Sequence, residues 1–169
     1  MSTDVLISAD EFQTAGLDPE GVYRMHFKSL AVVEKIAQSG KNVGNPYKRI
    51  EGQVDLVEKL GDGLLEYPIN AYFSAYTSGR QLQKFRNLYV AKYGKVPTSQ
   101  PGQISLAELT SAMVGVDDVW GVLYWKRDRE NPDVIRQELG YSYSTDPTTI
   151  KAPKSFADRN PVTTDEDDE

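Results

Sequence analysis

Alternation of apolar and polar residues in the first half of the chain predicts three β-strands. Residues 22–28 place apolar side chains on one face and basic side chains on the other. Residues 48–57 alternate in the same way, and residues 65–76 form a third strand after a Gly-Asp-Gly turn. The side chains expected to point inward are Tyr23, Met25, Phe27, Ile50, Val54, Leu56, Leu65, Tyr67, Ile69, Ala71 and Phe73.

The period then changes to that of a helix. Between residues 79 and 94 the apolar side chains recur at helical spacing, at Leu82, Phe85, Leu88 and Tyr89. Gly94 is suited to end this helix. Ser105, with Glu108 three residues later, predicts the capping box of a shorter helix through Met113.

Two further strands follow, at residues 119–126 and 135–143, separated by a charged loop that contains Pro132. The expected fold is mostly β, within the α+β class. Five strands with a helical insertion between the third and the fourth favour an OB-fold barrel, and a generic α+β sandwich is the alternative. The domain is expected over residues 17–145, between a flexible N-terminus (1–16) and a disordered acidic C-terminal tail (146–169).

Charge is unevenly distributed along the chain. The formal net charge is −6, and five negative charges stand at the C-terminus, on Asp165, Glu166, Asp167, Asp168 and Glu169. Residues 1–164 therefore carry a net charge of only −1. A nearly neutral body is compatible with a local cationic surface that attracts phosphate groups.

Motifs for catalysis are missing from the sequence. There is no cysteine, the single histidine is His26, and the HExxH, Walker and GxGxxG patterns do not occur. We therefore expect a protein that is not an enzyme and needs no cofactor or metal. The chain also has no apolar stretch of membrane-spanning length and no basic, hydrophobic start, so a cytoplasmic location is expected.

Basic and aromatic residues fall together on several of the expected strands. Binding of single-stranded nucleic acid needs cations along the phosphates and rings on which bases stack. The candidate nucleic-acid-binding residues are Arg24, Lys28, Lys41, Tyr47, Lys48, Arg49, Trp120, Tyr124, Lys126, Arg127, Arg129 and Arg136, and the last strand adds Tyr141 and Tyr143.

A single aromatic residue in a strand more often belongs to the core, however, and a basic one on the other face is usually just solvated. Alternation favours one face of residues 119–126 as a stacking surface, with Trp120 and Tyr124 beside Lys126. Both faces of this strand are apolar, so burial under the helices is the alternative.

The acidic tail has two interpretations. It is either a solubilising segment or a polyanion that competes with nucleic acid for a cationic groove. In the second case, nucleic acid would release the tail to contact partner proteins.

Two stretches carry a resemblance to a known family. They are residues 39–57, which begin Ser-Gly-Lys-Asn-Val-Gly-Asn-Pro, and residues 116–126, which are followed by Leu139-Gly140-Tyr141. Over roughly residues 20–145 the chain resembles phage-encoded single-stranded DNA-binding proteins. The resemblance implies an OB-fold and a role in phage DNA replication, recombination or repair in the host bacterial cytoplasm. It also implies an acidic tail that recruits replication or recombination proteins. The chain departs from the common tail pattern because it ends in Glu169, without a terminal hydrophobic residue, which favours contact through charge.

The leading hypothesis is thus a protein that coats single-stranded DNA without strong sequence preference. A structural or adaptor protein whose β-domain binds another protein is the alternative. A binder of double-stranded DNA is disfavoured, because the basic residues of the long helix are scattered around it rather than gathered on one face.

Overall fold

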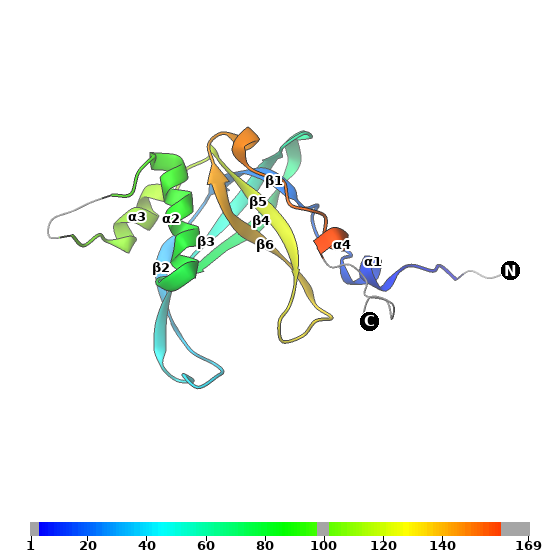
Figure 1. The fold of residues 1–169 in the computed structure, drawn as a ribbon, viewed down its shortest axis with the longest axis horizontal. Coiled ribbons are helices and arrows are strands. Elements are labelled where there is room, and N and C mark those ends of the chain that lie inside the picture. The colour runs from blue at the N-terminus through cyan, green and yellow to red at the C-terminus, as the bar shows by residue number, and fades with distance from the viewer. Residues whose placement is uncertain (1–3, 98–101, 160–169) are drawn as a thin grey trace, which may run out of the picture.

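The computed structural model describes residues 4–97 and 102–159. Within them, six strands form one open antiparallel sheet, and the chain is mostly β within the α+β class (Figure 1). The strands are β1 (Gly21–Phe27), β2 (Ala31–Ile36), β3 (Pro46–Lys59), β4 (Gly63–Tyr76), β5 (Val119–Arg127) and β6 (Ile135–Ser144).

Strand β3 organises the sheet. One edge of β3 pairs with β4, and the other edge pairs first with β2 and then with β1. β1 in turn pairs with β5, and β5 with β6. Gly52 allows this arrangement, because a Cβ at this position would lie only 1.9 Å from the carbonyl oxygen of Ser29. The segment that joins β1 to β2 can therefore pass close to β3 at Gly52, because this residue has no side chain.

The main core lies on the inner side of the curved sheet. The expected inward residues of the first two predicted strands are buried there, among them Tyr23, Phe27 and Ile50. Phe73 of β4 joins them, with its ring centroid 6.5 Å from that of Phe27. The alternation in residues 22–28 and 48–57 thus correctly predicted which of their side chains are buried.

Two helices flank the sheet. Helix α2 (Gly79–Tyr93) ends at Gly94, whose φ of 80° is left-handed, and helix α3 (Leu106–Met113) begins after Ser105, whose hydroxyl accepts from the Glu108 amide at 3.2 Å. Both predicted helix ends are confirmed. α2 bridges two strands, because Asn87 donates to the Tyr141 carbonyl of β6 and Lys84 to the Ser74 carbonyl of β4.

The expectation of five strands was wrong: the described residues contain six. Strand β2 was missed because four of its six residues are exposed and none is buried, which leaves no clear alternation. The prediction for Tyr67 was also wrong. Leu56 pairs with Ile69 but Glu58 with Leu64, and the irregularity between these pairs leaves Tyr67 77% exposed. Strands β4 and β6 approach one another, but the described residues show no hydrogen-bonded ladder between them.

Both ends of the domain are more structured than the sequence suggests. Helix α1 (Ala9–Gln13) begins after Ser8, whose hydroxyl accepts from the Glu11 amide. After β6, residues 146–159 contain a 3-10 turn (Pro147–Thr149) and helix α4 (Phe156–Arg159). We call residues 146–159 the C-terminal strap.

The strap packs on the outer face of β5, where Ile150 contacts Trp120 and Val122. Its far end is fixed by Glu20, whose carboxylate accepts from the Trp125 and Phe156 amides at 2.8 and 2.7 Å and pairs with Arg159. The predicted tail at Asp165 to Glu169 lies outside the described residues.

Candidate nucleic-acid interface

Three tyrosines share the outer face of β3 and β4. Because side chains alternate along a strand, the residues between the buried ones of β3 and β4 point outward. The register places Arg49 opposite Tyr76 and Gln53 opposite Tyr72. Tyr72 is 52% exposed and Tyr76 42% exposed, and the ring centroids of Tyr47 and Tyr76 lie 6.1 Å apart. We call Tyr47, Tyr72 and Tyr76 the tyrosine face.

Arg49 is held in place at the centre of this face. Its guanidinium carbon lies 4.2 Å from the centroid of the Tyr76 ring, a cation–π distance. Its Nε and a terminal nitrogen donate to the Ser74 hydroxyl, and Nε lies 3.5 Å from the Glu51 carboxylate. A cation fixed in this way loses little conformational entropy when it binds an anion.

Glu51 links two cations and one ring of the same surface. Lys35 of β2 pairs with its carboxylate at 2.6 Å, and the Tyr72 hydroxyl donates to the other oxygen. Burial alone would raise the pKa of Glu51, but the hydrogen bonds from Lys35 and Tyr72, with nearby Arg49, outweigh it and lower that pKa. Burial and the Glu51 carboxylate together raise the pKa of Tyr72 to about 12.

A groove continues this surface between β4 and β6. We call it the β4–β6 groove; its cavity has a volume of about 440 Å³. Its lining residues are Arg49, Tyr72, Ser74, Gln81, Lys84, Tyr124, Lys126, Arg136, Gln137, Glu138, Leu139 and Tyr141. The Tyr124 hydroxyl donates to Glu138 at 3.1 Å, and burial and this carboxylate raise the pKa of Tyr124 to about 12. The groove is therefore both cationic and aromatic.

Lys84 of α2 lies at the inner wall of the groove. Its Nζ is 5.1 Å from the centroid of the Phe73 ring and 5.8 Å from that of Tyr141. Burial lowers the pKa of Lys84 to about 8; Glu138 opposes this shift, while Arg49 and Lys126 add to it. The groove thus contains a buried ammonium group close to two further cations.

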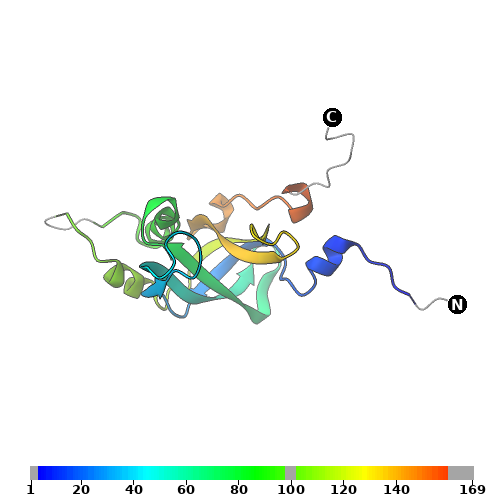
Figure 2. The ribbon, with the colours of Figure 1, turned by 90° about the horizontal axis from the view of Figure 1, so that it is seen from below.

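A second hollow lies at the other end of the tyrosine face. It is formed by the β2–β3 loop together with Tyr47 and Tyr76, and Lys41 is among its lining residues. The β2–β3 and β5–β6 loops extend in the same direction from the sheet (Figures 1 and 2). The hollow, the tyrosine face and the β4–β6 groove share residues with one another, so they form one continuous surface.

The structure brings half of the residues predicted for nucleic-acid binding to this surface. They are Lys41, Tyr47, Arg49, Tyr124, Lys126, Arg136 and Tyr141, whereas Tyr143 packs against the core. Arg136 also pairs with Asp128 at 3.0 Å and keeps 63% of its side chain exposed. They come from β3, β5, β6 and the β2–β3 loop.

The other predicted residues lie elsewhere. Trp120 is only 9% exposed, because the C-terminal strap covers it, so the prediction that it stacks bases was wrong. Arg24 pairs with Glu58, and Arg127 pairs with Asp10 and lies over the Phe156 ring.

Three more of them are solvent-facing cations. Lys28 borders a neighbouring hollow that shares Tyr72 with the groove. Lys48 points away from Arg49 because adjacent residues of a strand alternate. Arg129 is exposed in the β5–β6 loop.

Four cationic or aromatic residues of the surface were not on the predicted list: Lys35, Tyr72, Tyr76 and Lys84. Alternation in residues 65–76 contained the signal for Tyr72 and Tyr76, since both fall on the face opposite Phe73. Lys35 was missed with the strand that carries it. Lys84 has no signal in the sequence, because only the packing of α2 on β4 and β6 buries it.

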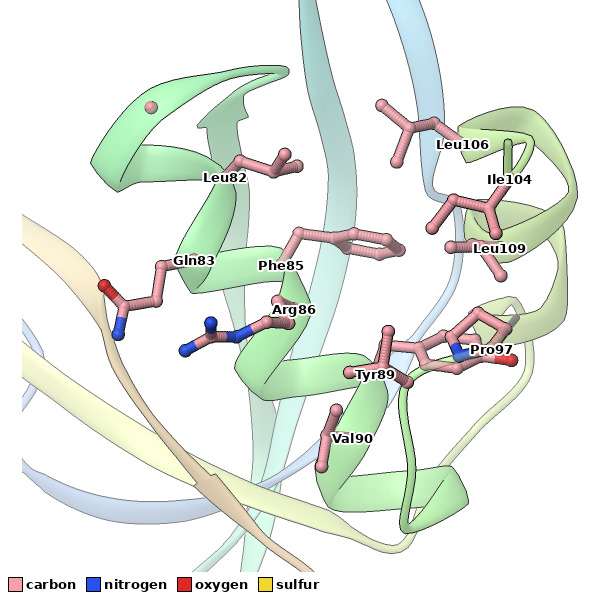
Figure 3. A pocket seen from close by; sticks show the side chains of 12 residues that line it. Leu82, Gln83, Phe85, Arg86, Tyr89, Val90, Pro97, Ile104, Leu106 and Leu109 are labelled. Atoms are coloured by element: carbon pink, nitrogen blue, oxygen red, sulfur yellow. The ribbon is translucent and has the colours of Figure 1, made fainter. Parts of the chain in front are cut away.

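A different, apolar cavity of about 400 Å³ lies between α2 and α3. Figure 3 shows Leu82, Phe85 and Tyr89 of α2 directed toward Ile104, Leu106 and Leu109, whereas Gln83 and Arg86 point away. This cavity has the composition of a site for an apolar side chain or ligand.

The chain matches no protein-family model, no curated protein and no solved structure. Among the described residues, no helix is long and apolar enough to cross a membrane. The same part of the chain contains no cluster of three or more His, Asp or Glu side chains suited to a metal ion. The sheet and its outer surface are therefore the features from which a function can be inferred.

Proposed function

We propose that the chain is a sequence-nonspecific, non-enzymatic single-stranded DNA-binding protein that acts in DNA replication, recombination or repair. The observation that carries this proposal is the continuous surface of exposed tyrosines and cations along β3, β4 and the β4–β6 groove. Aromatic rings stack bases of any sequence, at about 1–3 kcal/mol per base, and cations neutralise the phosphates beside them.

The arrangement of strands supports an OB-fold as the underlying fold. If β1 and β2 are counted as one strand interrupted at Ser29, the first strand lies between the second and the fourth, and the fourth pairs with the fifth. The third and fifth strands, β4 and β6, then face each other across the groove, and α2 follows the third strand. OB-folds bind oligonucleotides on their second and third strands and on the two adjoining loops, and the tyrosine face and the two long loops occupy those places.

The resemblance to phage single-stranded DNA-binding proteins supports the same conclusion, and it suggests a phage gene product that works in the host cytoplasm. In this proposal the acidic residues 165–169 compete with DNA or contact replication proteins. Arg159 lies 5.6 Å from the centroid of the Tyr124 ring in the groove wall. Asp165 follows Arg159 by six residues, and six extended residues span about 20 Å. The acidic segment is therefore long enough to reach the groove from Arg159.

Binding of a fluorescent oligo(dT) at low and at moderate salt tests the proposal. We expect binding at low salt and a steep loss with added salt, because each neutralised phosphate releases counterions. A duplex of the same length should bind more weakly. Absent or salt-insensitive binding at low salt would rule the proposal out.

A pair of matched variants locates the binding surface. Lys126→Glu reverses a charge at the groove, and Lys95→Glu reverses an exposed charge just after α2, away from it. We expect a loss of oligo(dT) affinity for the first variant only. Equal losses for both would indicate an unlocalised electrostatic effect and would contradict the assigned surface.

Deletion of residues 163–169 tests the tail. If the tail competes for the groove, its removal tightens oligo(dT) binding, most strongly at low salt. Unchanged affinity across the salt range would defeat the competition model while leaving DNA binding intact.

The apolar cavity between α2 and α3 supports an adaptor function as the second candidate. Leu82 of α2 and Leu109 of α3 both line it, and a protein partner could insert an apolar side chain there. If oligo(dT) does not bind, this candidate predicts that Leu82→Lys abolishes a protein contact, whereas Lys126→Glu leaves that contact unchanged.

A further inference from the structure

Lys84 is a buried cation without a carboxylate partner in the described part of the chain. The residue is 8% exposed, and its Nζ donates to the Ser74 carbonyl oxygen at 3.3 Å. None of the ion pairs within 4.0 Å among these residues involves Lys84. An ammonium group has three N–H donors, so two remain for another acceptor. Buried charges are normally paired, because an unpaired one is costly.

The surroundings of Lys84 favour an anion as that acceptor. The charged groups that face it are Arg49 of β3, Lys126 of β5 and Glu138 of β6. The one carboxylate among them already accepts the Tyr124 hydroxyl. Two cations from different strands thus reinforce the positive field at Lys84, and the groove opens at this point. A mobile anion can enter here, because Glu138 faces Lys84 without lying within the 4.0 Å of an ion pair.

We propose that Lys84 is the centre of an oxyanion subsite that binds one phosphodiester of a DNA strand lying on the tyrosine face. The ligand chemistry is a phosphate group, and its assignment to a DNA strand rests on the proposed function. Tyr72 belongs to both the tyrosine face and the groove, and Arg49, which lies over the Tyr76 ring, also lines the groove. A base stacked on Tyr72 would therefore place a neighbouring phosphate within reach of Lys84.

The burial of Lys84 gives the subsite a pH signature. With a pKa of about 8, Lys84 in the free protein has lost half of its charge near pH 8. A bound phosphate favours the ammonium form, so binding above this pH takes up a proton. We therefore expect affinity for DNA to fall as the pH rises from about 7 to about 9.5, on the scale of this titration.

Lys84→Gln tests the subsite, with Lys95→Gln as the matched control for net charge. At about pH 7 we expect Lys84→Gln to weaken oligo(dT) binding about tenfold, the effect of one charged hydrogen bond. The slope of log affinity against log salt should become shallower by about 0.7, the value for one phosphate of a single strand. The variant should also lose the fall in affinity between about pH 7 and 9.5 that the unaltered protein shows.

Equal effects of the two substitutions, or an unchanged pH profile for Lys84→Gln, would overturn the subsite. Proton uptake by the unaltered protein provides a measurement that does not depend on a variant. Calorimetry of oligo(dT) binding at about pH 8.5, in two buffers of different ionisation enthalpy, should show uptake of part of a proton. No uptake would contradict the proposal.

Inorganic phosphate separates the subsite from the proposed function. Sodium phosphate should raise the unfolding temperature of the unaltered protein more than sodium chloride of equal ionic strength does, and this difference should vanish in Lys84→Gln. Phosphate stabilisation without oligo(dT) binding would keep the subsite and refute the DNA-binding function. If Lys84→Gln does not change oligo(dT) binding and phosphate does not stabilise the protein, the DNA-binding function would stand and the subsite would be refuted. Preference for a 5′-phosphorylated over a 5′-hydroxyl oligo(dT) would overturn the assignment to an internal phosphodiester.

Discussion

Two outer strand faces of this sheet are rich in aromatic residues, yet only one of them is open. On β5, Trp120 and Val122 are covered by Ile150 of the C-terminal strap. On β3 and β4, Tyr72 and Tyr76 remain about half exposed, with Arg49 fixed between them. The two faces look alike as sequence patterns, and the difference is whether a later segment of the chain packs on them.

The chemistry of the two faces explains which one is covered. The covered part of β5 presents apolar atoms, so burying it under the strap is favourable. The tyrosine face has polar groups at its centre, where Lys35, Arg49 and Tyr72 all contact Glu51. Covering this cluster with apolar chain would desolvate several charges at once. An aromatic face is thus left open where its rings alternate with ion pairs.

The largest effect that follows from this comparison is on stability. Trp120→Ala should lower the free energy of unfolding by about 3–4 kcal/mol, because it leaves a cavity beneath the strap. Tyr72→Ala on the open face should lower it by only about 1 kcal/mol. Urea denaturation followed by circular dichroism measures both. Similar losses for the two variants would mean that the two faces are not differently covered.

The sequence predicted which side chains of the strands share a face, but it did not predict that the C-terminal strap covers the outer face of β5. Alternation correctly placed Tyr23 and Ile50 in the core and recognised that Trp120 and Tyr124 share one face of β5. It did not reveal the cover, because the strap after residue 145 has few apolar residues and no periodicity. Burial of Ile150 and Phe156 depends on contacts with β5 and on hydrogen bonds to Glu20, more than a hundred residues away.

The candidate site was predictable to a similar extent. Strand alternation is a local property, and it placed Lys126 on the same face of residues 119–126 as Tyr124. The site as a whole depends on the approach of β4 to β6 and on the packing of α2 against both, which are long-range. Lys84 therefore looked like one more charge scattered around a helix, whereas the fold buries it at the groove wall.

The next effect concerns the anchor of the strap. Each carboxylate oxygen of Glu20 accepts from one backbone amide, and one of them also pairs with Arg159; Glu20→Gln replaces one of these oxygens with an amide group that donates. We expect a loss of about 2 kcal/mol in unfolding free energy, the cost of leaving buried donors unpaired. Amide exchange in residues 150–156 should accelerate more than in β3. Glu66→Gln, an exposed carboxylate on β4, is the control and should change neither property. Unchanged exchange in the strap would show that Glu20 does not hold it.

A smaller effect is expected for DNA binding on the open face. Tyr72→Ala should weaken oligo(dT) binding about tenfold, the loss of one stacked base. Tyr67→Ala removes an equally large and more exposed ring from the same strand, outside the groove, and should leave the affinity unchanged. Fluorescence anisotropy at one salt concentration compares them. If the two variants lose affinity equally, exposed tyrosines on β4 contribute without regard to position, and the tyrosine face is not the binding surface.

The smallest effect compares single hydroxyl groups on the two sides of the sheet. The Tyr143 hydroxyl of β6 is buried and makes no hydrogen bond with the described residues, and burial raises the pKa of Tyr143 well above its usual value. By contrast, the Tyr72 hydroxyl donates to Glu51. Because an unpaired buried hydroxyl destabilises a core, Tyr143→Phe should leave the unfolding free energy unchanged or raise it by up to about 1 kcal/mol.

Tyr72→Phe removes a hydrogen bond to a charged group and should lower the unfolding free energy by about 0.5–1 kcal/mol. Both substitutions remove one hydroxyl group and keep the ring. Opposite changes in the unfolding free energy would therefore report the surroundings of the hydroxyl and not the packing of the ring. Thermal and urea unfolding of both variants at neutral pH give the comparison. A greater loss for Tyr143→Phe than for Tyr72→Phe would mean that the buried hydroxyl has a partner in solution, and that the interior beneath β5 and β6 is more polar than its side chains indicate.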